Sequence, residues 1–165
     1  MRAVGFDPGL ATTGFAAVER GRAGVSVLGT GLLRTQPAEP LGARLEQLFD
    51  GVHGVLDSFA PDLLVIEDLF SAPAVPRPAI LMAHARAVIF LVARQRKVAA
   101  VSVTPAEVKR AVTASGVAGK DQVARAVQAH FGLAVLPRPS HVADALALAF
   151  IGLSRAGGVG SLGMR

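Results

Sequence analysis

The chain of 165 residues contains no cysteine, no tryptophan and no tyrosine. Without cysteine it forms neither disulfides nor thiolate metal sites, which fits a reducing compartment. Any aromatic stacking on a ligand must come from phenylalanine, or from histidine or arginine in its place. The sequence also lacks both an uninterrupted apolar run long enough for a membrane span and the basic-then-apolar pattern of a secretion signal. We therefore expect a cytoplasmic protein.

Acidic residues are scarce in the second half of the chain. Residues 1–82 carry 6 Lys or Arg and 9 Asp or Glu, whereas residues 83–165 carry 11 and 3. An acidic half beside a strongly basic half can build a cation site next to a surface for a polyanion such as nucleic acid. The alternative is that the basic residues only keep the surface soluble.

The order of apolar runs and turn signals predicts one α/β domain over residues 1–154 and a flexible Gly-rich tail at 155–165. Three strands joined by short turns come first, and strands then alternate with helices. This order requires a five-stranded mixed sheet, with three antiparallel strands plus two parallel strands and helices on both faces. The expected elements are strands at 2–7, 14–19, 25–34, 63–67 and 98–103, helices at 41–59 and 79–96, and three further helices that begin after Thr104, at Lys120 and after Ser140.

Two of these strands end in an acid, Asp7 and Glu67, and a third acid, Asp144, lies near the start of the last helix. If the two strands are parallel neighbours, their final carboxylates lie about 5 Å apart. His141 precedes Asp144 by three residues, so both lie on one helix face. Oxygen and imidazole ligands without thiolate favour Mg²⁺ or Mn²⁺. Taken singly, Asp7 could be an ordinary turn former and Glu67 a solvated strand end, but their joint pattern predicts a metal site.

Two divalent ions held about 3.5–4 Å apart are a common device for phosphodiester hydrolysis. Lys109 or Lys120 could then neutralise the scissile phosphate. The N-terminal end of the last helix disfavours a cation, and Asp144 must offset that effect.

An ordered set of motifs resembles RuvC, the bacterial Holliday-junction resolvase (crossover junction endodeoxyribonuclease) family of the ribonuclease H-like superfamily, over roughly residues 2–153. The motifs are Gly5-Phe6-Asp7-Pro8-Gly9 with Thr13-Gly14, the run from Gly29 to Thr35, Pro61-Asp62 through Glu67 with Phe70, Ala83-His84-Ala85-Arg86, Val108-Lys109-Arg110-Ala111-Val112, Gly119-Lys120-Asp121-Gln122-Val123, and Ala143-Asp144-Ala145-Leu146-Ala147.

The resemblance implies a symmetric homodimer that binds four-way DNA junctions, makes paired nicks in strands of like polarity, and works with the RuvA–RuvB branch-migration complex. It implies Mg²⁺ or Mn²⁺ as cofactor, with two ions expected in each active site. The implied metal ligands are Asp7, Glu67, His141 and Asp144, with Lys120 also catalytic, and the implied DNA-binding residues are Phe70, Arg77, Lys109, Arg110 and Lys120.

The chain departs from the family pattern at four places. His141 stands where many members have Asp, which can shift metal preference toward Mn²⁺. Asp68 stands in place of a common Gln, adding negative charge near the site. Residues 71–78 are proline-rich where relatives are polar, and we expect no regular structure there. Ala87 replaces a common Gly in the long helix.

Three other functions fit parts of the sequence. A related nuclease could keep the acids and act on an RNA–DNA hybrid or another nucleic acid. Asp7-Pro8-Gly9 with Thr12-Thr13-Gly14 also resembles the first phosphate loop of actin-like ATPases, but the chain is too short for their two lobes. A non-catalytic junction-binding module is the third.

Overall fold

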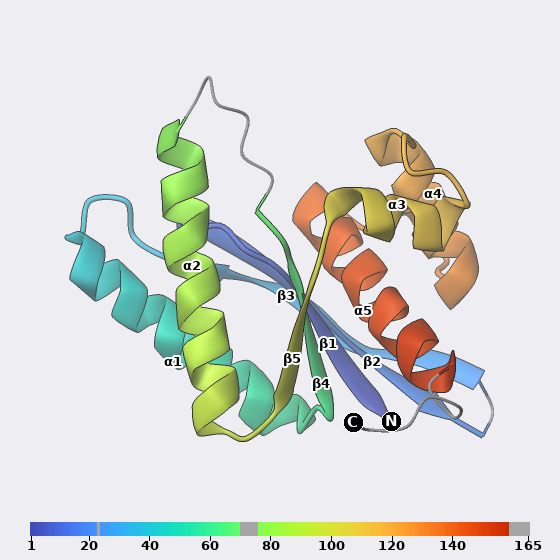
Figure 1. Ribbon diagram of the computed structural model, residues 1–165, viewed down its shortest axis with the longest axis horizontal. Coiled ribbons are helices and arrows are strands. Elements are labelled where there is room, and N and C mark those ends of the chain that lie inside the picture. Colours follow the sequence, from blue (N-terminus) through green and yellow to red (C-terminus); the bar gives the residue numbers. More distant parts are fainter. Residues whose placement is uncertain (23, 70–75, 159–165) are drawn as a thin grey trace.

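The computed structural model describes residues 1–22, 24–69 and 76–158. Five strands form one mixed sheet in the order β3-β2-β1-β4-β5 (Figure 1). β1 pairs antiparallel with β2 and parallel with β4, β2 pairs antiparallel with β3, and β4 pairs parallel with β5. The predicted sheet is confirmed. Its strands are β1 (Arg2–Asp7), β2 (Thr12–Gly21), β3 (Gly24–Arg34), β4 (Leu63–Glu67) and β5 (Ala99–Val103).

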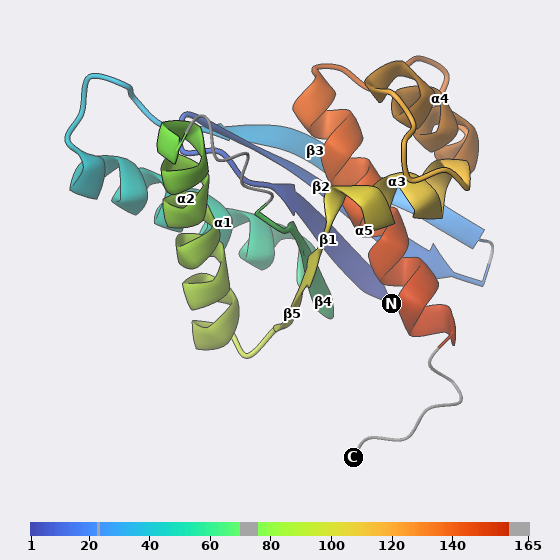
Figure 2. The ribbon, with the colours of Figure 1, turned by 45° about the horizontal axis from the view of Figure 1, so that its top comes forward.

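Helices cover both faces of the sheet (Figures 1 and 2). One core joins the sheet to α1 (Leu41–Phe59) and α2 (Pro76–Gln95). The other core joins the opposite face to α3 (Pro105–Thr113), α4 (Lys120–Phe131) and α5 (Ser140–Gly158). Among the described residues, none of the helices has the length and apolar character needed to cross a membrane.

Two glycines let α5 lie directly on the backbone of β1 and β2. A Cβ atom on Gly5 would stand 2.6 Å from the Ala149 nitrogen and 2.9 Å from the Leu148 Cβ. A Cβ atom on Gly14 would stand 2.8 Å from the carbonyl carbon of His141. Carbon atoms in normal contact are about 3.5–4.0 Å apart, so only glycine fits at both strand positions. This close approach brings the start of α5 to the end of β1.

The structure corrects the predicted start of α2. We expected no regular structure through residue 78, but α2 begins at Pro76 and contains Pro78 in its first turn. The first N–H groups of a helix have no partner within the helix, so proline is tolerated there. Residues 71–75 lie outside the described part of the chain, and so does Phe70.

Most other predicted features hold. Thr104 and Glu107 form the expected capping box of α3, and Gly132 ends α4 in a left-handed conformation. The β2–β3 pairing shifts register beside Gly29, where a bulge was one expectation. Ser140 is the first residue of α5 rather than its cap, and α5 continues to Gly158, beyond the domain boundary expected at residue 154.

Candidate active site

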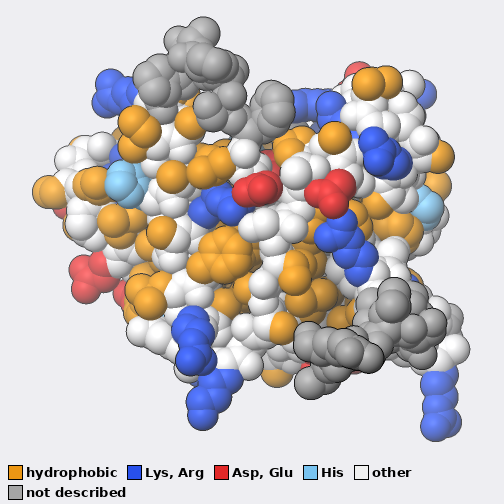
Figure 3. Space-filling view, in the orientation of Figure 1, with side chains coloured by type: hydrophobic (Ala, Val, Ile, Leu, Met, Phe, Trp, Pro, Cys, Tyr) orange, Lys and Arg blue, Asp and Glu red, His pale blue; other side chains and the backbone are white. Residues whose placement is uncertain are grey.

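A pocket of about 310 Å³ opens where β1 and β4 end beneath α3, α4 and α5. Figure 3 shows acidic and basic side chains close together near the middle of the face that it draws. Pro105, Val108 and Val123 supply the apolar wall. The pocket brings together six of the residues expected at the active site: Asp7, Glu67, Lys109, Lys120, His141 and Asp144.

The turn after β1 holds Asp7 in place. Thr13 is completely buried, and its hydroxyl donates to the Gly9 carbonyl at 2.8 Å. The Gly9 N–H in turn donates to the Thr13 hydroxyl at 3.2 Å. These two bonds close the Pro8-Gly9 turn against β2, so the last residue of β1 cannot swing into solvent.

Asp7 is only 8 % exposed, and a buried carboxylate needs a partner. His141 supplies one, because its Nδ1 lies 2.5 Å from Asp7 Oδ2. The two residues come from opposite ends of the chain, and the approach of α5 at Gly14 makes their contact possible. The sequence predicted His141 as a metal ligand, and the structure shows its ring in hydrogen-bond contact with Asp7.

The pocket concentrates negative charge. The pKa of Glu67 is raised to about 7, first by burial and then by the nearby charges of Asp7 and Asp144, while Lys120 opposes them. The pKa of Asp144 is also raised, first by burial and then by Asp7, with Lys120, His141 and Lys109 acting in the opposite direction. The lysines offset this charge only in part, so a bound cation would relieve the remaining repulsion.

The donor set suits Mg²⁺ or Mn²⁺, because it offers carboxylate oxygens and one imidazole. Across residues 1–22, 24–69 and 76–158, however, no three acidic or histidine side chains stand in an arrangement that could already hold a metal ion. Bringing these donors onto one ion requires side-chain rotation within the pocket.

The remaining predicted site residues lie elsewhere. Arg110 lines a separate surface pocket with Glu107 and Arg155, and the side chain of Arg77 is exposed near the start of α2. Asp68, which we expected to add negative charge near the site, is paired with Arg86 at 2.9 Å. Its charge is therefore compensated.

Sequence reasoning gave no role to two residues that support the acids. Thr13 was noted only as part of a motif. Its hydroxyl bonds to Gly9, four residues earlier, and threonine hydroxyls are known to bond nearby backbone groups in turns. Arg86 lies inside α2, whose other residues are mostly apolar. An arginine inside such a helix must find a buried partner, and that signal was available.

The chain matches known proteins over nearly its whole length. Residues 3–152 match the family model described as Crossover junction endodeoxyribonuclease RuvC. A curated relative of the same description from Dictyoglomus turgidum is 39 % identical, over 90 % of this chain and 93 % of its own length.

Solved structures give the same result. Thermus thermophilus RuvC in complex with Holliday junction substrate is 31 % identical, with a TM-score of 0.86 over 95 % of this chain and 96 % of that one. A further structure of Thermus thermophilus RuvC is 30 % identical with a TM-score of 0.83, over 95 % and 97 % of the two chains. The three acids, two lysines and one histidine thus occupy a fold shared with a junction-bound nuclease, and the chain belongs to the RuvC family of crossover junction endodeoxyribonucleases.

Proposed function

We propose that this endonuclease resolves four-way DNA junctions by paired, metal-dependent nicks made in the pocket at the ends of β1 and β4. One observation carries the proposal: Asp7, Glu67 and Asp144, from three separate elements, line one pocket with Lys109 and Lys120. Carboxylates beside basic residues are the combination needed to hold divalent cations and to receive a phosphate. Family membership favours this function over a phosphate-loop ATPase or a purely binding module.

Asp7, Glu67, Asp144 and His141 are the proposed ligands of Mg²⁺ or Mn²⁺, with two ions in each site. When bound, the cations would activate water and stabilise the leaving oxygen. The positive charge of Lys120 lowers the pKa of both Glu67 and Asp144. When these carboxylates hold metal ions, Lys120 can balance the negative charge of the scissile phosphate. His141 keeps the Asp7 carboxylate oriented through their hydrogen bond.

The proposed DNA surface extends outward from this pocket. Lys109 and Lys120 would contact phosphates next to the site, and Arg110 and Arg77 would contact DNA farther away. Base stacking by Phe70, which lies outside the described residues, would help to open the crossover, since such stacking contributes about 1–3 kcal/mol per base.

Paired nicks need two active sites, so we propose a homodimer. α2 exposes Ile80 and Leu91, which are 54 % and 52 % accessible, and such apolar side chains suit a contact between two copies. In the cytoplasm the dimer would work with the RuvA–RuvB complex, as proposed from the family resemblance.

The function is tested by incubating the protein with an end-labelled four-way junction and with a duplex of equal length, in Mg²⁺, Mn²⁺ or EDTA. We expect symmetric nicks in the junction only, and only with metal. Asp7→Asn should abolish nicking and leave junction binding largely intact, because it removes a ligand without changing size. Asp50→Asn is the matched control, since Asp50 is an exposed acid on α1. Nicking by Asp7→Asn at the rate of the control variant would refute the ligand assignment.

A further inference from the structure

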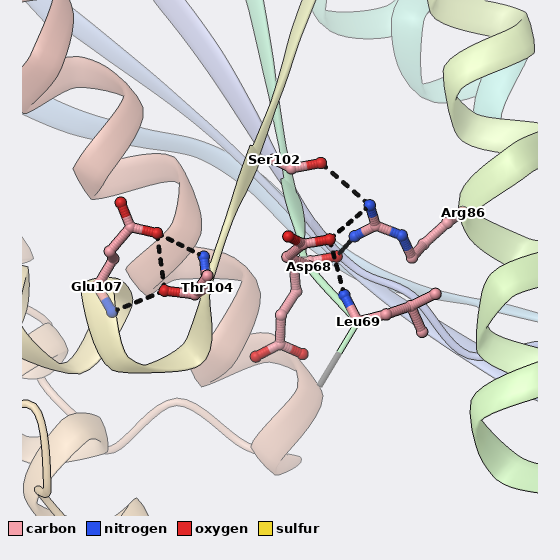
Figure 4. Close-up of polar contacts among 7 residues, drawn as sticks. Asp68, Leu69, Arg86, Ser102, Thr104 and Glu107 are labelled. Carbon is pink, nitrogen blue, oxygen red and sulfur yellow. Dashed lines mark hydrogen bonds and ion pairs between the residues drawn. The ribbon is translucent and has the colours of Figure 1, made fainter. Parts of the chain in front are cut away.

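Arg86 extends from α2 to the ends of β4 and β5 (Figure 4). Its Nη1 donates to the Glu67 carbonyl oxygen, and its Nη2 lies 3.0 Å from the Ser102 hydroxyl. Nη2 also lies 2.9 Å from Asp68 Oδ1. The guanidinium packs over the Phe90 ring, 5.6 Å from the centroid, and the side chain is only 12 % exposed. Four neighbours thus fix a charge that would be costly to bury alone.

The backbone explains why Glu67 needs this contact. The N–H of Asp68 donates to the Val103 carbonyl on β5 at 2.8 Å. Because the C=O and N–H of one planar peptide unit point in opposite directions, the Glu67 carbonyl faces away from β5, toward β1. The pairing of β1 with β4 stops at Phe6 and Ile66, and the next ladder donor would come from Pro8, which has no N–H. Arg86 supplies the missing donor.

The same guanidinium fixes the residue after Glu67. The Asp68 carboxylate accepts from Arg86 and, at 2.9 Å, from the Leu69 N–H, so both bonds hold the chain where it leaves β4 (Figure 4). The backbone on the C-terminal side of Glu67 is therefore clamped. The Glu67 carboxylate itself lines the pocket that it shares with Asp7, Asp144 and Lys120.

We infer that Arg86 is a positioning residue for catalysis: it locks the end of β4 to α2 and β5, and so aims the Glu67 carboxylate into the pocket. The inference rests on the proposed role of Glu67. It also makes the geometry of the site depend on α2, the helix whose exposed apolar side chains we assign to the contact between two copies. A shift of α2 would reach the end of β4 through this polar contact.

The test compares Arg86→Met, which keeps the apolar stem of the side chain without its donors, with Arg86→Lys and Arg96→Met. Arg96 is the matched control, because it also ties the end of α2 to a neighbouring element, through Asp57 at 2.8 Å, but its side-chain bonds run to α1 and not to β4. Three quantities are measured for folded protein: the single-turnover cleavage rate of a four-way junction, the junction Kd in EDTA, and the rise in thermal midpoint caused by Mn²⁺.

We expect Arg86→Met to cleave about 10–100-fold more slowly, because a misplacement of about 1 Å can cost on the order of 100-fold. Its junction Kd should stay within about 3-fold of wild type, and the Mn²⁺-induced rise in midpoint should shrink. Arg86→Lys should cleave at an intermediate rate, because a single ammonium group replaces the planar guanidinium and cannot reach all of its partners at once. Arg96→Met should lose stability without this selective loss of rate.

Wild-type cleavage by folded Arg86→Met would overturn the inference, and so would a loss of rate matched by Arg96→Met or fully explained by weaker junction binding. If Arg86→Met does not fold, Arg86→Lys decides: slower cleavage at unchanged Kd supports the inference, and the wild-type rate overturns it. Glu67→Gln separates this inference from the proposed function. Normal cleavage by Glu67→Gln would refute the role of Glu67 itself, whereas an inactive Glu67→Gln beside a fully active Arg86→Met would refute only the positioning role.

Discussion

Replacing Gly14 by alanine should disable the active site from a position that carries no functional side chain. The new Cβ would meet the first turn of α5, 2.8 Å from the His141 carbonyl carbon and 2.9 Å from its Cβ, and closer still to its carbonyl oxygen. Normal carbon contacts need about 3.5 Å, so the start of α5 must retreat by roughly 0.7 Å or more. That retreat would pull His141 from Asp7 and move Asp144 away from the pocket.

The expected loss follows from this displacement. A misplacement near 1 Å can slow catalysis on the order of 100-fold, so we expect the single-turnover cleavage rate to fall about 10–100-fold. Overpacking costs about 1–3 kcal/mol, and each kcal/mol lowers the midpoint of a domain of this size by about 2–4 °C. The variant should therefore remain folded at 25 °C.

Gly21→Ala is the control for this experiment. Gly21 lies at the other end of β2, and a Cβ there meets no atom within 4 Å. Cleavage rates of both variants would be measured on the same junction, with circular dichroism melts to confirm folding. If folded Gly14→Ala cleaves at the rate of Gly21→Ala, the close approach of α5 does not set the geometry of the site.

Two more predictions concern charge. Glu67 has a folded-state pKa of about 7 against an ordinary 4.5, so the unfolded chain loses this proton first and the metal-free protein loses stability as pH rises from about 4.5 to 7. In EDTA at pH 8, Glu67→Gln should be more stable than wild type by on the order of 2 kcal/mol in unfolding free energy, and should therefore melt at a higher temperature. The two melting temperatures should converge near pH 4.5. Equal melting at pH 8 would show that the charged Glu67 carboxylate does not destabilise the fold. Lys109→Ala should weaken junction binding and reduce the slope of log Kd against log salt by about 1, whereas Lys97→Ala, an exposed lysine after α2, should not. An unchanged slope for Lys109→Ala would remove Lys109 from the DNA surface.

Glu67 and Asp7 illustrate how closely the site could be predicted. Each ends an apolar strand, and the sequence predicted that their carboxylates would lie close together if the two strands were parallel neighbours. The structure meets that condition, because β1 pairs parallel with β4. The helix spacing of His141 and Asp144 placed both on one face in the same way, because helix geometry is local.

Arg86 and Thr13 show what stayed hidden. Arg86 binds a backbone carbonyl at the end of β4 and Thr13 binds one in the turn just before it, and no periodicity in the sequence identifies either partner. The start of α2 at Pro76 was also missed, because proline signals both a loop and a first helical turn. The ion pair with Arg86 compensates the negative charge that Asp68 was expected to add, and the sequence alone did not reveal this partner.

Local patterns in the chain were sufficient for the strands, the helices, the capping box at Thr104 and the family, because each depends on residues close together in sequence. The folded molecule alone set the contact of His141 with Asp7, which joins residues 134 positions apart. It alone set the raised pKa of Glu67, which comes from burial and from charges on other elements. Both depend on how closely α5 lies on the sheet, and that distance follows from the packing of the whole domain.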